Sequence, residues 1–159
     1  MPNLTVVRAG NDLLAEPADA LVNPVNTAGV MGRGLALQFR QAWPAMYADY
    51  RQACRNGEVT IGIMHVWATG HEQPRYLINF PTKRHWRSPS RLPDIQAGLS
   101  DLAATVSDLA LTSIAIPALG CGLGGLPWPD VEAAIRHTMA PLTATTDVTV
   151  FAPSPHSPH

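Results

Sequence analysis

Lysine is nearly absent from this chain of 159 residues: of its eleven lysines and arginines, only Lys83 is a lysine. Arginine serves most roles of a surface cation, but its guanidinium stays protonated at any biological pH. An amine can lose its proton and act as a nucleophile or a base. The use of arginine at every other position therefore indicates amine chemistry at Lys83. The alternative is that this single lysine has no special role.

Cysteine is scarce, and long apolar runs and an excess of one charge are missing. Cys54 and Cys121 lie far apart in no metal-ligand pattern, and the six histidines are scattered, so we expect neither a metal site nor a cofactor. No signal peptide opens the sequence and no apolar run approaches the length of a membrane span, which predicts a cytoplasmic protein without a membrane partner. The net charge of −1 gives no global field for nucleic acid, so any such affinity has to be local.

The composition is that of a globular domain, with 46% hydrophobic and 14% charged residues. Short β-rich runs alternate with amphipathic helical patterns, and several runs are almost continuously apolar, as in strands covered on both faces. We expect strands at 4–7, 20–24, 61–68, 75–80, 113–118 and 148–151, and helices at 34–43, 44–55, 94–109 and 130–139. This alternation predicts a single three-layer α/β/α domain over residues 1–152, with a mixed, mostly parallel sheet of about six strands. Residues 153–159 are expected to form a disordered tail or linker.

Two glycine-dense segments follow expected strands at the edge where open α/β sheets bind ligands. Residues 29–34 read Gly-Val-Met-Gly-Arg-Gly, come after Asn23 and Asn26, and open into a helix; residues 120–125 read Gly-Cys-Gly-Leu-Gly-Gly. Glycines let the backbone approach a ligand closely, and a helix N-terminus favours an anion. The pair predicts a clamp on two linked phosphates, and tight turns alone are the alternative. Because no acidic residue ends the next strand, a nicotinamide-dependent dehydrogenase is disfavoured.

Three further segments carry candidate binding residues. Asp12 suits a hydrogen bond from an exocyclic amine such as that of adenine, or an ordinary helix cap. Phe151, at the end of the last strand, suits stacking on a base or a place in the core. The third is a basic cluster interleaved with aromatic rings: Lys83, Arg84, His85, Trp86, Arg87 and Arg91. Such a cluster on a neutral chain is typical of a contact with single-stranded nucleic acid, and a solvated basic loop is the alternative.

Together these segments resemble the macrodomain family of ADP-ribose-binding modules, over nearly the whole of residues 4–152. The resemblance implies that Asp12 reads adenine, that Phe151 flanks it and that Asn26 lies beside the distal ribose. The other residues that it places in contact with ADP-ribose are Leu13, Asn23, Met31, Gly32, Arg33, Gly34, Gly120, Cys121, Gly122, Leu123 and Gly124.

A subgroup is indicated by residues 30–39, Val-Met-Gly-Arg-Gly-Leu-Ala-Leu-Gln-Phe, and 79–87, Asn-Phe-Pro-Thr-Lys-Arg-His-Trp-Arg. Both resemble bacterial DNA ADP-ribosyl glycohydrolase antitoxins of the DarT–DarG type, which remove ADP-ribose from thymidine after a partner toxin attaches it. These antitoxins are similar in turn to the lysine-dependent terminal ADP-ribose protein glycohydrolase of animals. The resemblance implies hydrolysis of an N-glycosidic bond with Lys83 and Asn26 as catalytic residues. It implies DNA contacts by Arg84, His85, Trp86, Arg87 and Arg91.

The implied partners are ADP-ribose, ADP-ribosylated single-stranded DNA and a DNA ADP-ribosyltransferase toxin, and we expect a monomer. The animal enzyme has an aspartate in its Gly-Cys-Gly-Leu loop where this chain has Gly124. DNA-directed relatives manage without that acid, so the difference favours DNA over glutamate-linked protein. The alternatives are a module that only binds ADP-ribose, an enzyme acting on modified protein, and an ADP-ribose 1″-phosphate phosphatase.

Overall fold

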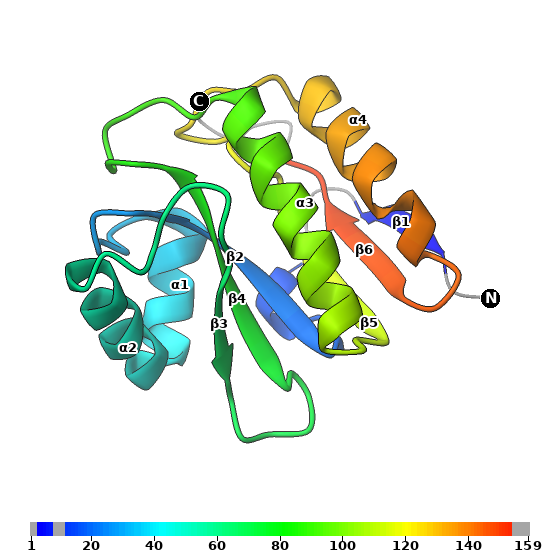
Figure 1. The fold of residues 1–159 in the computed structure, drawn as a ribbon, viewed down its shortest axis with the longest axis horizontal. Coiled ribbons are helices and arrows are strands. Elements are labelled where there is room, and N and C mark those ends of the chain that lie inside the picture. Colours follow the sequence, from blue (N-terminus) through cyan, green and yellow to red (C-terminus); the bar gives the residue numbers. More distant parts are fainter. Residues whose placement is uncertain (1–2, 8–11, 154–159) are drawn as a thin grey trace.

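The computed structural model describes residues 3–7 and 12–153 and shows a six-stranded sheet between layers of helices (Figure 1). The strands are β1 (Leu4–Val7), β2 (Ala20–Asn26), β3 (His65–Ala68), β4 (Tyr76–Lys83), β5 (Ser113–Ile116) and β6 (Asp147–Phe151). The helices are α1 (Gly34–Ala42), α2 (Pro44–Arg55), α3 (Leu92–Asp108) and α4 (Trp128–Met139), with short 3-10 helices η1 (Leu13–Ala15) and η2 (Ala140–Leu142). In the order β1-β6-β5-β2-β4-β3, only the β3–β4 pair is antiparallel. The predicted three-layer α/β/α fold with a mixed, mostly parallel sheet is confirmed.

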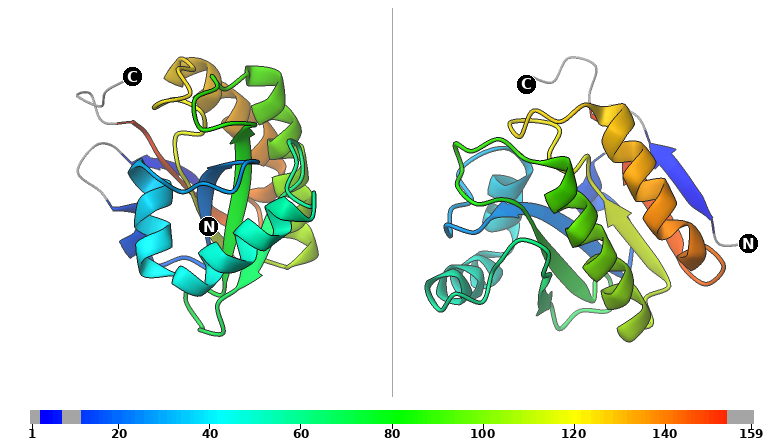
Figure 2. Two further views of the ribbon diagram at one scale, coloured as in Figure 1. Left: turned by 90° about the vertical axis from the view of Figure 1, so that its left-hand side faces the viewer. Right: turned by 45° about the horizontal axis from the view of Figure 1, so that its top comes forward.

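Two hydrophobic cores hold the layers together. Helices α3 and α4 cover one face of the sheet, and α1, α2 and η1 cover the other (Figure 2). Because side chains alternate along a strand, neighbouring residues of β2 enter different cores: Leu21 packs with α1 and α2, and Val22 with α3 and α4. Helix α3 lies close to β4 because Gly98 has no side chain; a Cβ there would collide with the Phe80 ring.

Several boundaries differ from the expected ones. Strand β2 continues past Pro24 and β4 continues past Pro81, because proline removes only its own N–H from the ladder; a register shift follows between Val25 and Asn26. The strand expected at 61–68 is confined to β3, because Gly62 has φ +88° in the preceding turn. Of the tail expected at 153–159, only Pro153 is among the described residues. Within residues 3–7 and 12–153, no helix has the length and apolarity to cross a membrane.

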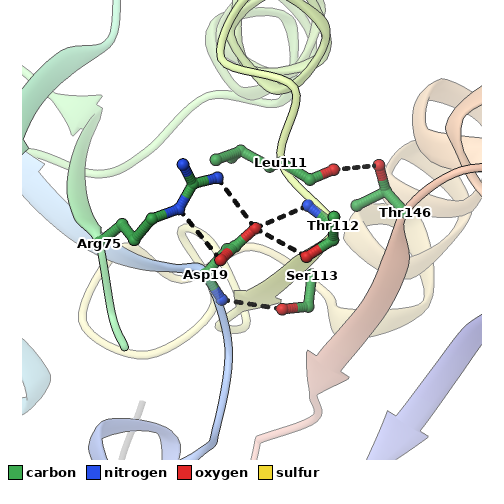
Figure 3. Close-up of polar contacts among 6 residues, drawn as sticks. All are labelled: Asp19, Arg75, Leu111, Thr112, Ser113 and Thr146. Atoms are coloured by element: carbon green, nitrogen blue, oxygen red, sulfur yellow. Dashed lines mark hydrogen bonds and ion pairs between the residues drawn. The ribbon is translucent and has the colours of Figure 1, made fainter. Parts of the chain in front are cut away.

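The amino edge of the sheet is tied together by Asp19, which precedes β2 (Figure 3). Its carboxylate accepts hydrogen bonds from Arg75 Nε and Nη2, both at 3.2 Å, and from the Thr112 N–H and hydroxyl, both at 2.8 Å. The Asp19 N–H donates to Ser113 Oγ at 2.8 Å. Burial alone would raise the pKa of Asp19, but the hydrogen bonds from Arg75 and Thr112 outweigh it, so this pKa lies below its usual value. The network fixes the starts of β2, β4 and β5.

Candidate active site at the carboxyl edge of the sheet

The two residues predicted to be catalytic lie beside each other where β2 and β4 end. Asn26 is the register partner of Lys83 across the two parallel strands. The Thr27 N–H donates to the Lys83 carbonyl at 3.1 Å, and the Thr27 hydroxyl donates to the Arg84 carbonyl at 3.0 Å. The loop after β2 and the loop after β4 are therefore bonded together at the base of the candidate site.

Lys83 is half-buried, and its Nζ donates to the Trp86 carbonyl at 2.9 Å. Burial of the amine, and then the positive charge of Arg33, lower the pKa of Lys83 below its usual value. Among the described residues no carboxylate forms an ion pair with it. The neutral amine is therefore more populated at a given pH than in an ordinary lysine, which is the property that nucleophilic chemistry requires.

The carboxamide of Asn26 shapes the loop that follows it. Its Oδ1 accepts the N–H groups of Ala28 at 2.9 Å and Val30 at 3.3 Å, and its Nδ2 donates to the Val30 carbonyl at 2.8 Å. The buried Tyr50 hydroxyl lies 2.6 Å from the Asn26 carbonyl and 3.1 Å from its Oδ1. The second N–H of the carboxamide forms no hydrogen bond among the described residues, and the predicted contact with the distal ribose stays a prediction.

Asn23 belongs to a buried polar row beneath the site. Its side chain is fully buried, and its Nδ2 donates to Asn79 Oδ1 at 3.0 Å. Asn79 Nδ2 in turn lies 3.0 Å from His65 Nδ1, so the row crosses β2, β4 and β3. Burial lowers the pKa of His65 and favours its neutral form. Met31 is fully buried as well. The structure gives Asn23 and Met31 interior positions, and their contact with a ligand stays a prediction.

The Gly120–Gly125 loop is bonded to the end of the basic-aromatic loop. The Ser90 N–H donates to the Gly124 carbonyl at 3.0 Å. A Cβ on Gly124 would collide with the Ser90 hydroxyl and with the Gly120 carbonyl, so no side chain fits at position 124 without movement. Burial raises the pKa of Cys121 to about 11, which keeps its thiol protonated at neutral pH.

This loop borders a cavity of about 210 Å³. Its lining residues are Cys121, Gly122, Gly125, Leu126, Pro127, Trp128 and Pro153. The Trp128 indole nitrogen is buried without a hydrogen-bond partner among the described residues. Leu123 is exposed beside the cavity. A hollow lined by three residues of the second glycine loop and by Trp128 therefore lies at the carboxyl end of β5.

The segment after Lys83 presents an aromatic platform. The His85 and Trp86 rings stack with centroids 3.7 Å apart, and 43% of Trp86 is exposed. His85 Nδ1 accepts the Arg87 N–H at 3.1 Å, which fixes the turn. Arg84 pairs with Asp94 at 3.1 Å, whereas Arg87 and the exposed Arg91 form no ion pair among the described residues. Arg84 is thus engaged by α3, whereas His85, Trp86 and Arg87 are in contact with one another. A role of these residues and Arg91 in DNA binding stays a prediction.

The remaining predicted ligand residues lie at the start of α1 and on η1. Gly32, Arg33 and Gly34 are exposed at the α1 N-terminus, where Gly34 has φ +56°. Asp12 Oδ1 accepts the Leu14 N–H at 3.0 Å, so the helix-cap alternative is realised. Leu13 and Phe151 belong to the core between the sheet and α1/α2. Binding of adenine by these residues stays a prediction.

Sequence reasoning missed Tyr50, Asn79, Ser90 and His65 as organisers of the site. Asn79 lies within a segment that the sequence did single out, so its polar character at a strand centre was a usable signal. Tyr50 contacts Asn26, which is 24 residues away in the sequence. Ser90 contacts the backbone carbonyl of Gly124. Contacts of that kind leave no mark in local sequence.

Comparison with known proteins identifies the fold family. The Macro domain model matches residues 22–135. A Thermus aquaticus protein named DNA ADP-ribosyl glycohydrolase is 49% identical over 143 residues, which are 89% of this chain and 39% of that protein. The macrodomain of Mycobacterium tuberculosis DarG aligns with TM-score 0.91 and 46% identity, over 96% of this chain and 100% of that one. Thermosipho africanus DarTG, solved in complex with ADP-ribose, aligns with TM-score 0.85 and 28% identity, over 94% of this chain and 42% of that one.

The chain spans about two fifths of the length of the curated DNA ADP-ribosyl glycohydrolases that it matches. The matched segment contains the ends of β2 and β4, the whole Gly120–Gly125 loop and most of α4. The matched segment therefore includes Asn26, Lys83 and the second glycine loop, whereas β1, η1 and β6, with Leu13 and Phe151, lie outside it. On this evidence the chain belongs to the Macro domain family.

Proposed function

We propose that this chain removes ADP-ribose from modified DNA by hydrolysing its N-glycosidic bond to thymidine, with Lys83 as the catalytic amine. The observation that carries the proposal is the half-buried Lys83, with its lowered pKa, beside Asn26. The loop after Lys83 is bonded to loop 27–30 through Thr27 and to the second glycine loop through Ser90. The relatives support the assignment, since one is named DNA ADP-ribosyl glycohydrolase and DarTG was solved with ADP-ribose.

Lys83 has two possible chemical roles in breaking the bond between the ribose anomeric carbon and the thymine nitrogen. As a neutral amine it bonds to the anomeric carbon while thymine leaves with the bonding electron pair and takes up a proton. The sugar ring opens to a Schiff base, and one water then hydrolyses it to free ADP-ribose and restore the amine. As an ammonium it instead stabilises the negative charge on the departing base or on a nearby phosphate.

The other residues would bind and orient the substrate. The exposed α1 N-terminus, with Gly32 to Gly34, suits the diphosphate, and the cationic Arg33 adds attraction. Asn26 holds loop 27–30 in shape and has one N–H left for a ribose hydroxyl. The Trp86–His85 platform suits the modified or the neighbouring base, because every base offers a face for stacking.

The packing at Gly124 favours DNA over glutamate-linked protein as the substrate. An acidic side chain at this position would collide with Ser90, so the site offers no carboxylate beside Lys83 from this loop. Hydrolysis that relies on a lysine and an acid from that loop is therefore disfavoured, and chemistry by Lys83 alone is the consistent alternative. Action on DNA would also require a cytoplasmic protein, and a DNA ADP-ribosyltransferase as the source of its substrate.

The test is turnover of a single-stranded oligonucleotide that carries ADP-ribose on one thymidine. Wild type, Lys83→Ala and Lys83→Arg are compared, with Arg136→Ala on α4 as a matched control, and the products are separated by chromatography. We expect wild type and the control to release ADP-ribose and intact oligonucleotide, and Lys83→Ala to release neither. If wild type binds ADP-ribose in calorimetry but releases none from DNA, the chain is a binding module or acts on another linkage.

Trapping with a hydride donor separates the two roles of Lys83. A Schiff base is reduced to a stable adduct of ADP-ribose on Lys83, which mass spectrometry detects in wild type and not in Lys83→Arg. An electrostatic role predicts no adduct and residual activity in Lys83→Arg, because that variant keeps the positive charge.

A further inference from the structure

Acidic residues lie at both edges of the sheet, whereas the cations are concentrated on α1, α2 and the loops after β2 and β4. At the amino edge lie Asp19 before β2, Asp108 at the end of α3 and Asp147 at the start of β6. The cations that form no ion pair among the described residues come from α1, α2 and the loops after β2 and β4: Arg33, Arg40, Arg51, Arg55, Lys83, Arg87 and Arg91. These elements and loops carry one described acid, Asp49 of α2, whose carboxylate accepts the Trp67 indole N–H at 2.6 Å. Cations outnumber acids there, so a chain of net charge −1 presents a positive side to a polyanion.

Two of these cations are held over one aromatic ring on the helical layer. The Arg40 guanidinium of α1 lies 4.6 Å from the Tyr47 ring centroid, and that of Arg51 lies 5.5 Å from it. Both arginines are exposed. Contact with the ring limits their motion without neutralising their charge, and a guanidinium in this state is suited to bidentate binding of a phosphate.

This Arg40–Tyr47–Arg51 stack is continuous with the candidate site. The Tyr47 hydroxyl donates to the Gly29 carbonyl at 3.4 Å, and a Cβ built on Gly29 lies 3.5 Å from Cys54 Cβ. At its other end, the same loop is bonded through Thr27 to the carbonyls of Lys83 and Arg84. The left view of Figure 2 shows the loop after β4, the loop after β2, α1 and α2 on one side of the molecule.

We propose that the DNA strand flanking the modified thymidine runs from the Trp86–His85 platform, across loop 27–30, onto the Arg40–Tyr47–Arg51 stack, where the two guanidiniums bind its phosphates. The inference rests on the proposed function and extends it, because it assigns a binding surface on α1 and α2 outside the ADP-ribose site. The two arginines lie over the Tyr47 ring, so this ring is not offered to a base and the surface presents only cations. We therefore expect it to bind phosphates without recognising base sequence.

The experiment compares two substrates: an oligonucleotide of about twelve nucleotides with a central ADP-ribosylated thymidine, within the length range of single-strand sites, and the ADP-ribosylated mononucleotide. The variants are Arg40→Ala/Arg51→Ala, the charge-preserving Arg40→Lys/Arg51→Lys, and Arg136→Ala as the control from the opposite face. The alanine double variant should raise KM for the oligonucleotide, leave kcat unchanged and leave both constants for the mononucleotide unchanged.

The salt dependence of KM for the oligonucleotide gives the expected size of the effect. Each phosphate contact on a single strand contributes about 0.7 to the slope of log affinity against log salt, so two lost contacts reduce the slope by about 1.4. The ratio of KM between the alanine double variant and wild type should therefore fall about sevenfold between about 50 and 200 mM salt. The lysine double variant should keep the wild-type slope.

Equal KM of wild type and the alanine double variant on the oligonucleotide would overturn the inference and leave the proposed function intact. An equal rise in KM on both substrates would overturn the inference too, because the two arginines would then not act through the flanking strand. If wild type releases no ADP-ribose from either substrate, the proposed function fails separately. Anisotropy titrations with unmodified oligonucleotide still decide the inference in that case: weaker binding by the alanine double variant supports it, and unchanged binding overturns it.

Discussion

Replacing Asp19 by alanine tests whether the amino edge of the sheet is held by one carboxylate. The Thr112 N–H and hydroxyl each lie 2.8 Å from Asp19 Oδ2, and the Asp19 side chain is only 14% exposed. Hydrogen bonds to an ionised group contribute about 1.5 kcal/mol each at the low end of their range, so losing both should cost about 3 kcal/mol. In a domain of this size, that lowers Tm by about 6–12 °C. Arg75 adds less, because its side chain is 41% exposed and its charge is screened by solvent.

The assay is urea unfolding of wild type, Asp19→Ala and Glu72→Gln as a control that removes an exposed acid from the β3–β4 turn. The sign of the pH dependence follows from the lowered pKa of Asp19. Its stabilisation is present above the unfolded-state pKa and is lost as pH falls through the folded-state pKa. The difference between wild type and Asp19→Ala should thus shrink in acid. The reasoning would be refuted if the free energies of unfolding of wild type and Asp19→Ala differ by less than about 0.5 kcal/mol at neutral pH, which is the usual effect of a surface substitution. It would also be refuted if this difference does not shrink in acid.

Three further outcomes are expected. Gly124→Ala should destabilise by about 1–3 kcal/mol through overpacking against Ser90 and the Gly120 carbonyl. Ser90→Gly/Gly124→Ala, which relieves the first of these clashes, should lose less, as measured by urea unfolding. Trp86→Ala should raise KM for the modified oligonucleotide roughly 5- to 150-fold through lost stacking while calorimetric affinity for free ADP-ribose stays unchanged. If Lys83 attacks as a neutral amine, kcat should rise with pH and level off above the Lys83 pKa, which lies below that of an ordinary lysine; a fall over that interval would indicate the ammonium.

Much of the architecture was predictable, because it follows from local patterns. Apolar runs and helical periodicity located the six strands and the four α-helices of the described chain, but not the short 3-10 helices η1 and η2; both glycine loops lie at the carboxyl edge as expected. Asn26 and Lys83 were both expected near strand ends, but the pairing of β2 with β4, which makes them register partners, was not predicted. The strand ends were less predictable, because we expected strands to end at proline. In the structure each proline removes only one N–H donor from the ladder, and the strand continues.

The two asparagines show why the rest of the site was not predictable. Residues three apart on a regular strand point to opposite faces, which would separate Asn23 from Asn26. The register shift after Val25 instead lets Asn26 reach Tyr50 on the α2 side, the side on which Asn23 contacts Met31. One asparagine is therefore fully buried in the row with Asn79, while the other shapes the loop. A bulge of this kind depends on tertiary contacts and leaves no local signal.

The difference between Lys83 and Arg33 explains why the chain keeps one lysine among arginines. Arg33 stands exposed at the α1 N-terminus, where a permanent charge is useful for holding an anion. Burial of the amine is the larger cause of the lowered pKa of Lys83, and the charge of Arg33 is the smaller one. Both make the neutral form of Lys83 more populated. An arginine at position 83 would keep its proton in the same field, and a lysine at position 33 would be a less rigid phosphate ligand. Under the proposed function the two positions therefore require different cations: a permanent charge at Arg33 and an amine that can lose its proton at Lys83.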